Sequence, residues 1–201
     1  MELTQTSMTK AKLWTKDFII ITLTAFLVFL TFYLLMTTMT LYAIEQFNAS
    51  QTTAGLAASI FVIGSLCSRP FTGKLLDLRG ENIIIYPALI LFTIGLFCLS
   101  QSYGSGMMLV ASALIALGFG NMISCSQVAV VNLAPNHRIG LATSTFYIAM
   151  DAGIGVGPII IGTILPHFGY RGMYASMAVL VLITIVIYYF VHGRHVKVTA
   201  S

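Results

Sequence analysis

Apolar residues fill six long runs along the chain, separated by short stretches that hold charge, proline or glycine. A helix needs roughly 20 mainly apolar residues to cross about 30 Å of hydrocarbon. Short links make sequential helices antiparallel neighbours. We expect transmembrane helices at Phe18–Ile44, Thr52–Phe71, Ile83–Leu99, Met107–Leu133, Ile139–Leu165 and Met173–His192.

The composition places these runs in a membrane. Of the 201 residues, 58% are hydrophobic and only 8% are charged, whereas a soluble domain carries about 25% charged residues. The first run is longer than the apolar region of a secretory signal and should remain as the first helix. The expected fold is an all-α membrane protein, with an N-terminal segment at 1–17, a six-helix bundle at 18–192 and a tail at 193–201.

The basic residues predict the orientation of the bundle. Of the ten Lys and Arg residues, Arg171 alone lies on one side of the expected membrane. Short cytoplasmic loops are rich in Lys and Arg, so both termini should be cytoplasmic in a multi-pass cell-membrane protein. The net charge of +4 then reflects topology and contact with anionic membrane lipid, and does not indicate nucleic-acid binding.

Polar residues within the apolar runs form stripes. Thr24, Thr31 and Thr38 are spaced by seven, which returns a side chain to nearly the same helix face. This stripe could pack against another helix or line a polar path. Asn121 and Ser124 share a face of the fourth run. Burying an amide without a partner costs free energy, so this face should either hydrogen-bond to another helix or line a cavity.

Asp151 is the most informative single residue. It lies twelve positions from Ile139, about 18 Å along a helix, and therefore near the middle of the bilayer. A carboxylate there costs roughly 2.5–3.5 kcal/mol on insertion scales, so it should face protein or water. Tyr147 lies one turn away on the same face. Asp151 is thus a candidate proton carrier, and the alternative is a structural hydrogen bond to a neighbouring helix.

Glycine and proline follow Asp151 closely. Gly153 and Gly157 form a GxxxG pair roughly opposite the acid, which permits close backbone contact on a separate face. Pro158 removes a backbone donor, and Gly162 adds further freedom. A deformable helix beside an ionisable group suits a moving part.

Two motifs resemble those of the major facilitator superfamily. The expected loop between the second and third helices carries Gly73, Asp77, Arg79 and Gly80, similar to the family's cytoplasmic signature. Its glycines would permit a turn, and its charged residues could form a latch that breaks and reforms. The stretch with Gly153, Gly157, Pro158 and Gly162 resembles the family's antiporter signature.

The resemblance implies a drug/proton antiporter-like transporter, but the family has twelve helices in two similar halves, and six are expected here. It therefore implies efflux of a lipophilic small molecule by a homodimer or with a partner. The residues before about Gly73 resemble the start of a full transporter and the last three helices resemble its end, so we expect two ends joined near the signature loop; the alternative is a natural half-size protein. The alternative to transport is an internally deleted or vestigial half-transporter with no activity of its own. Neither motif identifies the substrate.

The remaining classes of function find no support in the residues. The sequence has no nucleotide loop of the Gly-x4-Gly-Lys-Ser/Thr type and no histidine within a membrane run to act as a base. Cys67, Cys98 and Cys125 lie inside apolar runs with no Cys-x-x-Cys spacing. We therefore expect no enzyme activity, no cofactor and no metal site.

Overall fold

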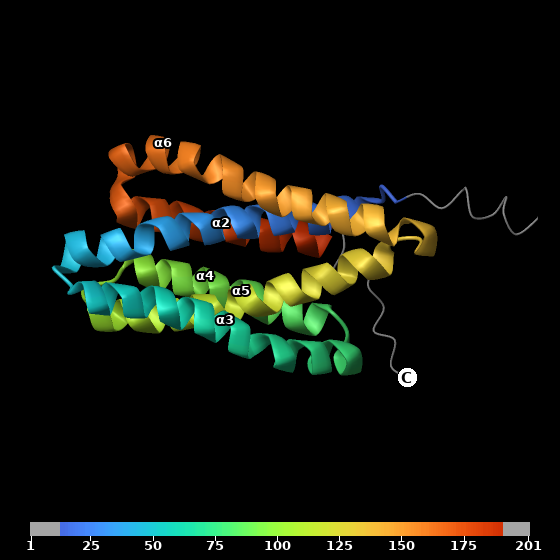
Figure 1. Cartoon of the computed structure of the whole chain (residues 1–201), viewed down its shortest axis with the longest axis horizontal. Helices are drawn as coiled ribbons and strands as arrows, with labels where there is room; N and C mark the ends of the chain where they lie inside the picture. Colours follow the sequence, from blue (N-terminus) through green and yellow to red (C-terminus); the bar gives the residue numbers. More distant parts are fainter. Residues whose placement is uncertain (1–12, 191–201) are drawn as a thin grey trace, which may run out of the picture.

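The computed structural model describes residues 13–190, apart from the side chains of Asp77 and Arg79. Most of the N-terminal segment 1–17, the end of the sixth predicted run at His192 and the tail 193–201 lie outside these residues. Every regular element of the described part is a helix (Figure 1). The elements are α2 (Lys16–Phe47), α3 (Gln51–Arg79), α4 (Asn82–Ser100), α5 (Ser105–Leu133), the short 3-10 helix η1 (Asn136–Arg138) and α6 (Ile139–Tyr188).

Side-chain caps set the first helix boundaries. The Thr15 hydroxyl accepts a hydrogen bond from the Phe18 amide at 3.2 Å, and α2 begins there. Ser50 caps α3 in the same way through the Thr53 amide, also at 3.2 Å. Such caps satisfy amides that have no partner inside the helix. Asn48 ends α2 in the left-handed conformation, with φ 47°.

The fifth and sixth predicted runs form two arms of one element, α6. Its helix is interrupted at Gly169, where φ is 63° and ψ is −178°. Glycine takes positive φ without a steric penalty, so the chain can fold back at this residue. Figure 1 shows the first arm (139–168) and the second arm (170–188) running side by side in opposite directions. With its two arms taken together, α6 is one of five apolar helices in the described residues that are long enough to span a membrane. Six separate crossings stay a prediction.

The signature segment is helical over most of its length, in contrast to the predicted loop. Gly73 lies inside α3, which continues to Arg79. The turn comes at Gly80, where φ is 78° and the amide donates to the Leu76 carbonyl at 3.0 Å. Helix-favouring residues between the two glycines account for the longer helix. The latch formed by Asp77 and Arg79 stays a prediction, because their side chains are not described.

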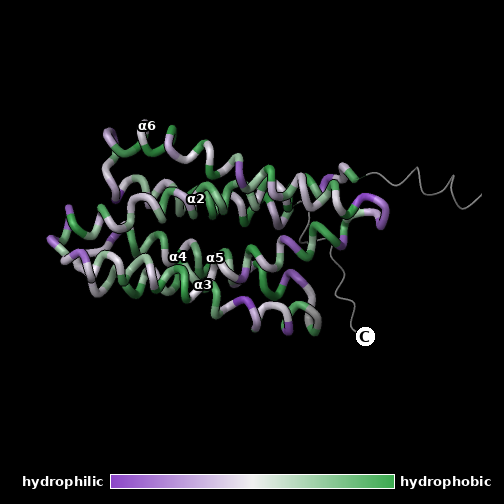
Figure 2. The backbone as a smooth tube through the Cα atoms, viewed as in Figure 1, coloured by the Kyte–Doolittle hydropathy of each residue, from purple (hydrophilic) through white to green (hydrophobic). Residues whose placement is uncertain are grey.

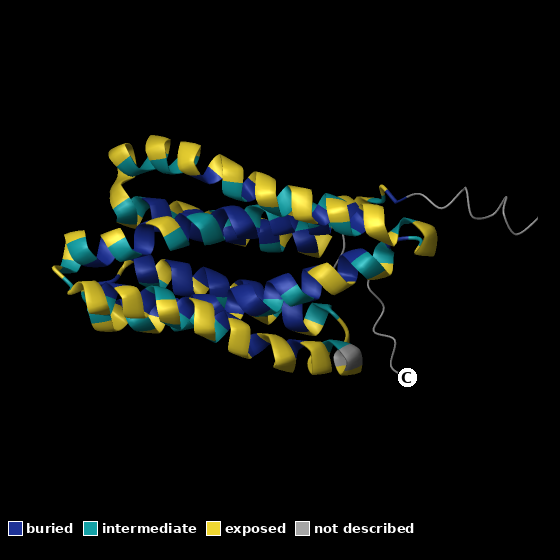
Figure 3. Ribbon diagram, in the orientation of Figure 1, coloured by how far each residue is buried: buried dark blue, intermediate teal, exposed yellow. Residues whose placement is uncertain are grey.

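The helices form an elongated bundle with α3 at one edge and the first arm of α6 at the other (Figure 1). The most hydrophilic residues gather mainly towards the two ends, and apolar residues fill much of the middle (Figure 2). Buried positions concentrate where α2, α4, α5 and the second arm meet, and exposed positions follow the two edges (Figure 3).

Glycines bring α5 close to its neighbours. A Cβ added at Gly118 would lie 2.5 Å from the Ala88 carbonyl oxygen and 2.6 Å from the Phe92 amide nitrogen, both on α4. Without a Cβ the two backbones can touch, which is how many membrane helices associate. Around this contact Phe119 stacks on Phe32 with ring centroids 4.6 Å apart. The centre of the bundle is therefore held by close backbone contact and aromatic packing.

Candidate transport site on the first arm of α6

The first arm of α6 is the least buried long helix segment at the edge of the bundle. Four of its residues are buried, against seven on the shorter second arm. Two of the four are Gly153 and Gly157, which pack directly against α2. A Cβ at Gly153 would lie 2.6 Å from the Phe26 carbonyl oxygen, and one at Gly157 would collide with the Tyr33 ring. The glycine pair thus joins the arm to α2 along one face.

The opposite face of the arm is uncovered. Asp151, Tyr147, Pro158 and Gly162 are all exposed in the single chain. At 100° per residue, Asp151 lies about 160° around the helix from Gly153, so the acid and the packing face are separate. Gly162 has no atom within 4 Å of the position that a Cβ would occupy. The antiporter-like glycines therefore divide between a packed face and an open face.

One hydrogen bond connects this open face to α5. The Gln127 amide nitrogen donates to the Tyr147 hydroxyl oxygen at 3.1 Å. Both side chains are exposed, and Asp151 follows Tyr147 by one helical turn. We call the side chains of Gln127, Tyr147 and Asp151 the polar ridge. They come from two helices, α5 and α6.

Asp151 has no hydrogen bond or ion pair with any residue that the structure describes. It lies twelve residues from Ile139, where the arm begins, and eighteen from the break at Gly169. A carboxylate in hydrocarbon must find protein or water. No described side chain bonds the acid in the single chain, so a position inside the membrane would require a wet cavity or a second protein surface.

The threonine stripe lies inside the bundle. Thr24, Thr31 and Thr38 are at most 2% exposed. Thr38 shares a hydrogen bond of 2.9 Å with the Tyr174 hydroxyl of the second arm, and bonds the Leu34 carbonyl at 2.6 Å. In the single chain, therefore, the stripe packs against other helices; that it lines a polar path stays a prediction.

The polar pair on α5 is satisfied within the bundle as well. The Asn121 side-chain oxygen accepts a hydrogen bond from the Thr72 hydroxyl of α3. Ser124 donates to the Gly120 carbonyl one turn back, at 3.1 Å. Neither residue joins the polar ridge. Gln127 does so, because α5 turns a different face towards α6.

Helical spacing places Gln127 about 120° around α5 from Asn121, so the polar face predicted from Asn121 and Ser124 does not include it. A signal was present, since an amide inside an apolar run needs a partner. The sequence does not say which helix supplies that partner. Only the approach of the first arm to α5 brings Tyr147 within hydrogen-bonding distance.

The arrangement is suited to proton exchange and to binding an organic cation. A lone carboxylate can take up and release a proton, and its negative form attracts a positive charge. Aromatic faces also attract cations, and the exposed Tyr147 ring lies one helical turn from Asp151. Within the described residues no group of three or more His, Cys, Asp or Glu side chains is placed to hold a metal ion.

Comparison with known proteins agrees with this architecture. Multidrug resistance protein MdtG from Salmonella dublin is 25% identical over 192 residues, which cover 92% of this chain and 47% of MdtG. The Salmonella typhi protein of the same name has the same identity and coverage. The chain spans about half the length of the curated relatives it matches.

Solved structures share the fold. A bacterial homologue of the human drug peptide transporters PepT1 and PepT2 superposes with a TM-score of 0.80 at 16% identity, covering 93% of this chain and 44% of that one. A POT family transporter in complex with a thioalcohol-conjugated peptide gives 0.80 at 20% identity, covering 90% and 39%. The family model of the Major Facilitator Superfamily matches residues 21–201. The chain therefore belongs to the Major Facilitator Superfamily of membrane transporters.

Proposed function

We propose that two copies of this chain form a proton-coupled exporter of small lipophilic compounds. The observation that carries the proposal is Asp151, a carboxylate exposed near the middle of an apolar helix in a chain of this family. Ionisable residues in membrane segments are costly and commonly mark proton or substrate paths. Asp151 would carry the proton, while Tyr147 and Gln127 would orient groups beside it.

The proposed cargo is a lipophilic cation. The curated relatives are named multidrug resistance proteins, and an acid one helical turn from the Tyr147 ring suits a flat organic cation. In liposomes with an acidic lumen, the purified chain should accumulate ethidium as protons leave in exchange. Ethidium fluorescence follows this directly, and collapsing the pH gradient should stop it. No accumulation by an assembled dimer would contradict the proposal.

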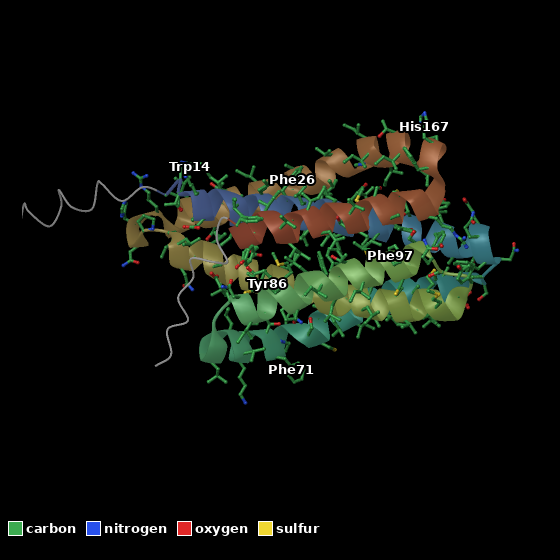
Figure 4. The ribbon with its side chains drawn as sticks, turned by 180° about the vertical axis from the view of Figure 1, so that it is seen from behind. Trp14, Phe26, Phe71, Tyr86, Phe97 and His167 are labelled. Atoms are coloured by element: carbon green, nitrogen blue, oxygen red, sulfur yellow. The ribbon has the colours of Figure 1, made fainter. Side chains whose placement is uncertain are left out.

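We propose six membrane crossings with both termini in the cytoplasm. Each arm of α6 is at least 19 residues long, enough for about 28 Å of helix, and the charge bias of the loops supports the orientation. Figure 4 shows His167 at the end of the bundle opposite Trp14. His167 should therefore face the outside of the cell.

Impermeant thiol labelling tests this orientation. In a background with Cys67, Cys98 and Cys125 changed to serine, His167→Cys should react in intact cells, because His167 is exposed at an end of the first arm. Ser201→Cys should react only after the membrane is opened. Labelling of Ser201→Cys alone in intact cells would reverse the topology.

A second copy supplies the missing wall in this proposal. Asp151 is exposed in the single chain without a hydrogen bond to a described residue, and hydrocarbon cannot satisfy its carboxylate. Open glycines beside it allow a second helix to approach closely. The match to MdtG spans 192 residues and 47% of that protein, which favours one continuous half over two joined ends. A two-fold contact is the commonest way for identical chains to complete such a site.

Cross-linking in native membranes tests the dimer. Ser144→Cys places a thiol on the exposed side of the first arm, and Val179→Cys places one on the exposed side of the second arm. A short bifunctional maleimide should link Ser144→Cys into dimers and leave Val179→Cys monomeric. Monomers in both variants, or equal cross-linking, would contradict the proposed interface.

A further inference from the structure

A groove of about 340 Å³ opens between the N-terminal end of α2 and the first arm of α6. Aromatic and aliphatic side chains of α2 form most of its wall, and Ala149 faces them from α6. Figure 4 shows Trp14 at the end of the bundle and Phe26 further along α2. The groove is separate from the polar ridge, because Ala149 lies on a different side of the first arm from Asp151.

Carbon atoms form almost the whole wall of this groove. Thr22 is one of its lining residues, but the Thr22 hydroxyl oxygen is buried and is not accessible to a bound molecule. A groove of this kind suits a hydrocarbon chain, whose burial against apolar side chains needs no hydrogen-bond partner.

A positive charge stands at the mouth of the groove. Lys16 is exposed and shares a helix face with Ile19 and Leu23, which line the groove. The neighbouring Asp17 is partly buried. Trp14 is 60% exposed beside Lys16, and tryptophan is enriched where a membrane meets water.

We propose that this groove binds one anionic phospholipid. Its phosphate lies at Lys16, and one acyl chain fills the space beside Ala149. The lining residue Phe26 follows Lys16 by ten residues, about 15 Å along the helix, so the groove runs from the level of the headgroup into the acyl-chain region. The site does not depend on transport activity or on the dimer.

Trp14, the single tryptophan of the chain, reports on this lipid. We place the full-length chain in phosphatidylcholine nanodiscs that contain brominated phosphatidylglycerol or brominated phosphatidylcholine, since bromine quenches tryptophan on contact. The brominated phosphatidylglycerol should quench Trp14 at about a fivefold lower mole fraction than the brominated phosphatidylcholine. This is the preference for anionic lipid that one Lys near the membrane surface contributes. Lys16→Gln should remove this preference, and Lys74→Gln, an exposed lysine on α3, should keep it.

One further variant tests the groove itself. Ala149→Phe should fill the groove and reduce quenching by both brominated lipids without changing the headgroup preference. Equal quenching by the two lipids in the unmodified chain, or equal losses in Lys16→Gln and Lys74→Gln, would overturn the site in favour of diffuse attraction. Displacement of the brominated lipid by low concentrations of ethidium would instead assign the groove to cargo.

Discussion

Asp151→Asn should abolish transport driven by a proton gradient while the protein still folds and inserts. The amide keeps the shape and a hydrogen-bonding group but fixes the neutral state, so no proton can be exchanged. An amide is also cheaper than a carboxylate in hydrocarbon, so expression should not fall. Ethidium binding should persist and lose its dependence on pH. Gradient-driven ethidium accumulation in liposomes measures the expected loss.

Two other variants make this experiment decisive. Glu45→Gln removes an exposed carboxylate near the far end of α2 and should transport normally. Asp151→Leu distinguishes the two roles of the acid. If Asp151 is only a structural hydrogen-bond partner, the leucine variant should be damaged and the asparagine variant should transport almost normally. Unimpaired coupled transport by Asp151→Asn would eliminate the proton-carrier role.

Gly118→Ala should destabilise the bundle strongly for so small a change. The added methyl group would meet the Ala88 carbonyl oxygen at 2.5 Å and the Phe92 amide nitrogen at 2.6 Å. Both are backbone atoms of α4, so the two helices must separate. Overpacking of this kind costs typically 1–3 kcal/mol. The thermal denaturation midpoint in detergent should fall accordingly.

Gly55→Ala is the matched control. Gly55 is an exposed helical glycine of α3, and no atom lies within 4 Å of its added Cβ. Alanine is favoured over glycine in a helix by about 1 kcal/mol, so this variant should be as stable as the original chain or slightly more stable. Equal midpoints for Gly118→Ala and Gly55→Ala would show that α4 and α5 are not packed as described.

The sequence predicted the helices well because the membrane sets their length. Each predicted run lies largely within a described helix, although α3 extends from Gln51 to Arg79, beyond the predicted end at Phe71. Apolar character stops near Phe71, whereas helical hydrogen bonding continues to the glycine that can take a positive φ. The end of α3 was therefore decided by backbone conformation at Gly80 and not by hydropathy.

The candidate site was predictable only in part. Asp151 stands out in any apolar run because of the cost of its charge, and the glycine spacing already separated a packing face from the face of the acid. The partner of Tyr147 was not predictable. Gln127 belongs to a different helix, and their hydrogen bond depends on how α5 and α6 approach each other.

By itself the sequence determined the apolar helical runs, the charge bias of the links between them and the place of Asp151 well inside one of these runs. The tertiary structure alone decided that Thr24, Thr31 and Thr38 point into the bundle, that Gly169 folds α6 into two arms, and that the first arm is left uncovered. The physical reason lies in the solvent. In water, an apolar stripe marks the side of a helix that faces the core. In lipid, the core and the surroundings are equally apolar, so the pattern along a helix does not indicate which face meets its neighbours.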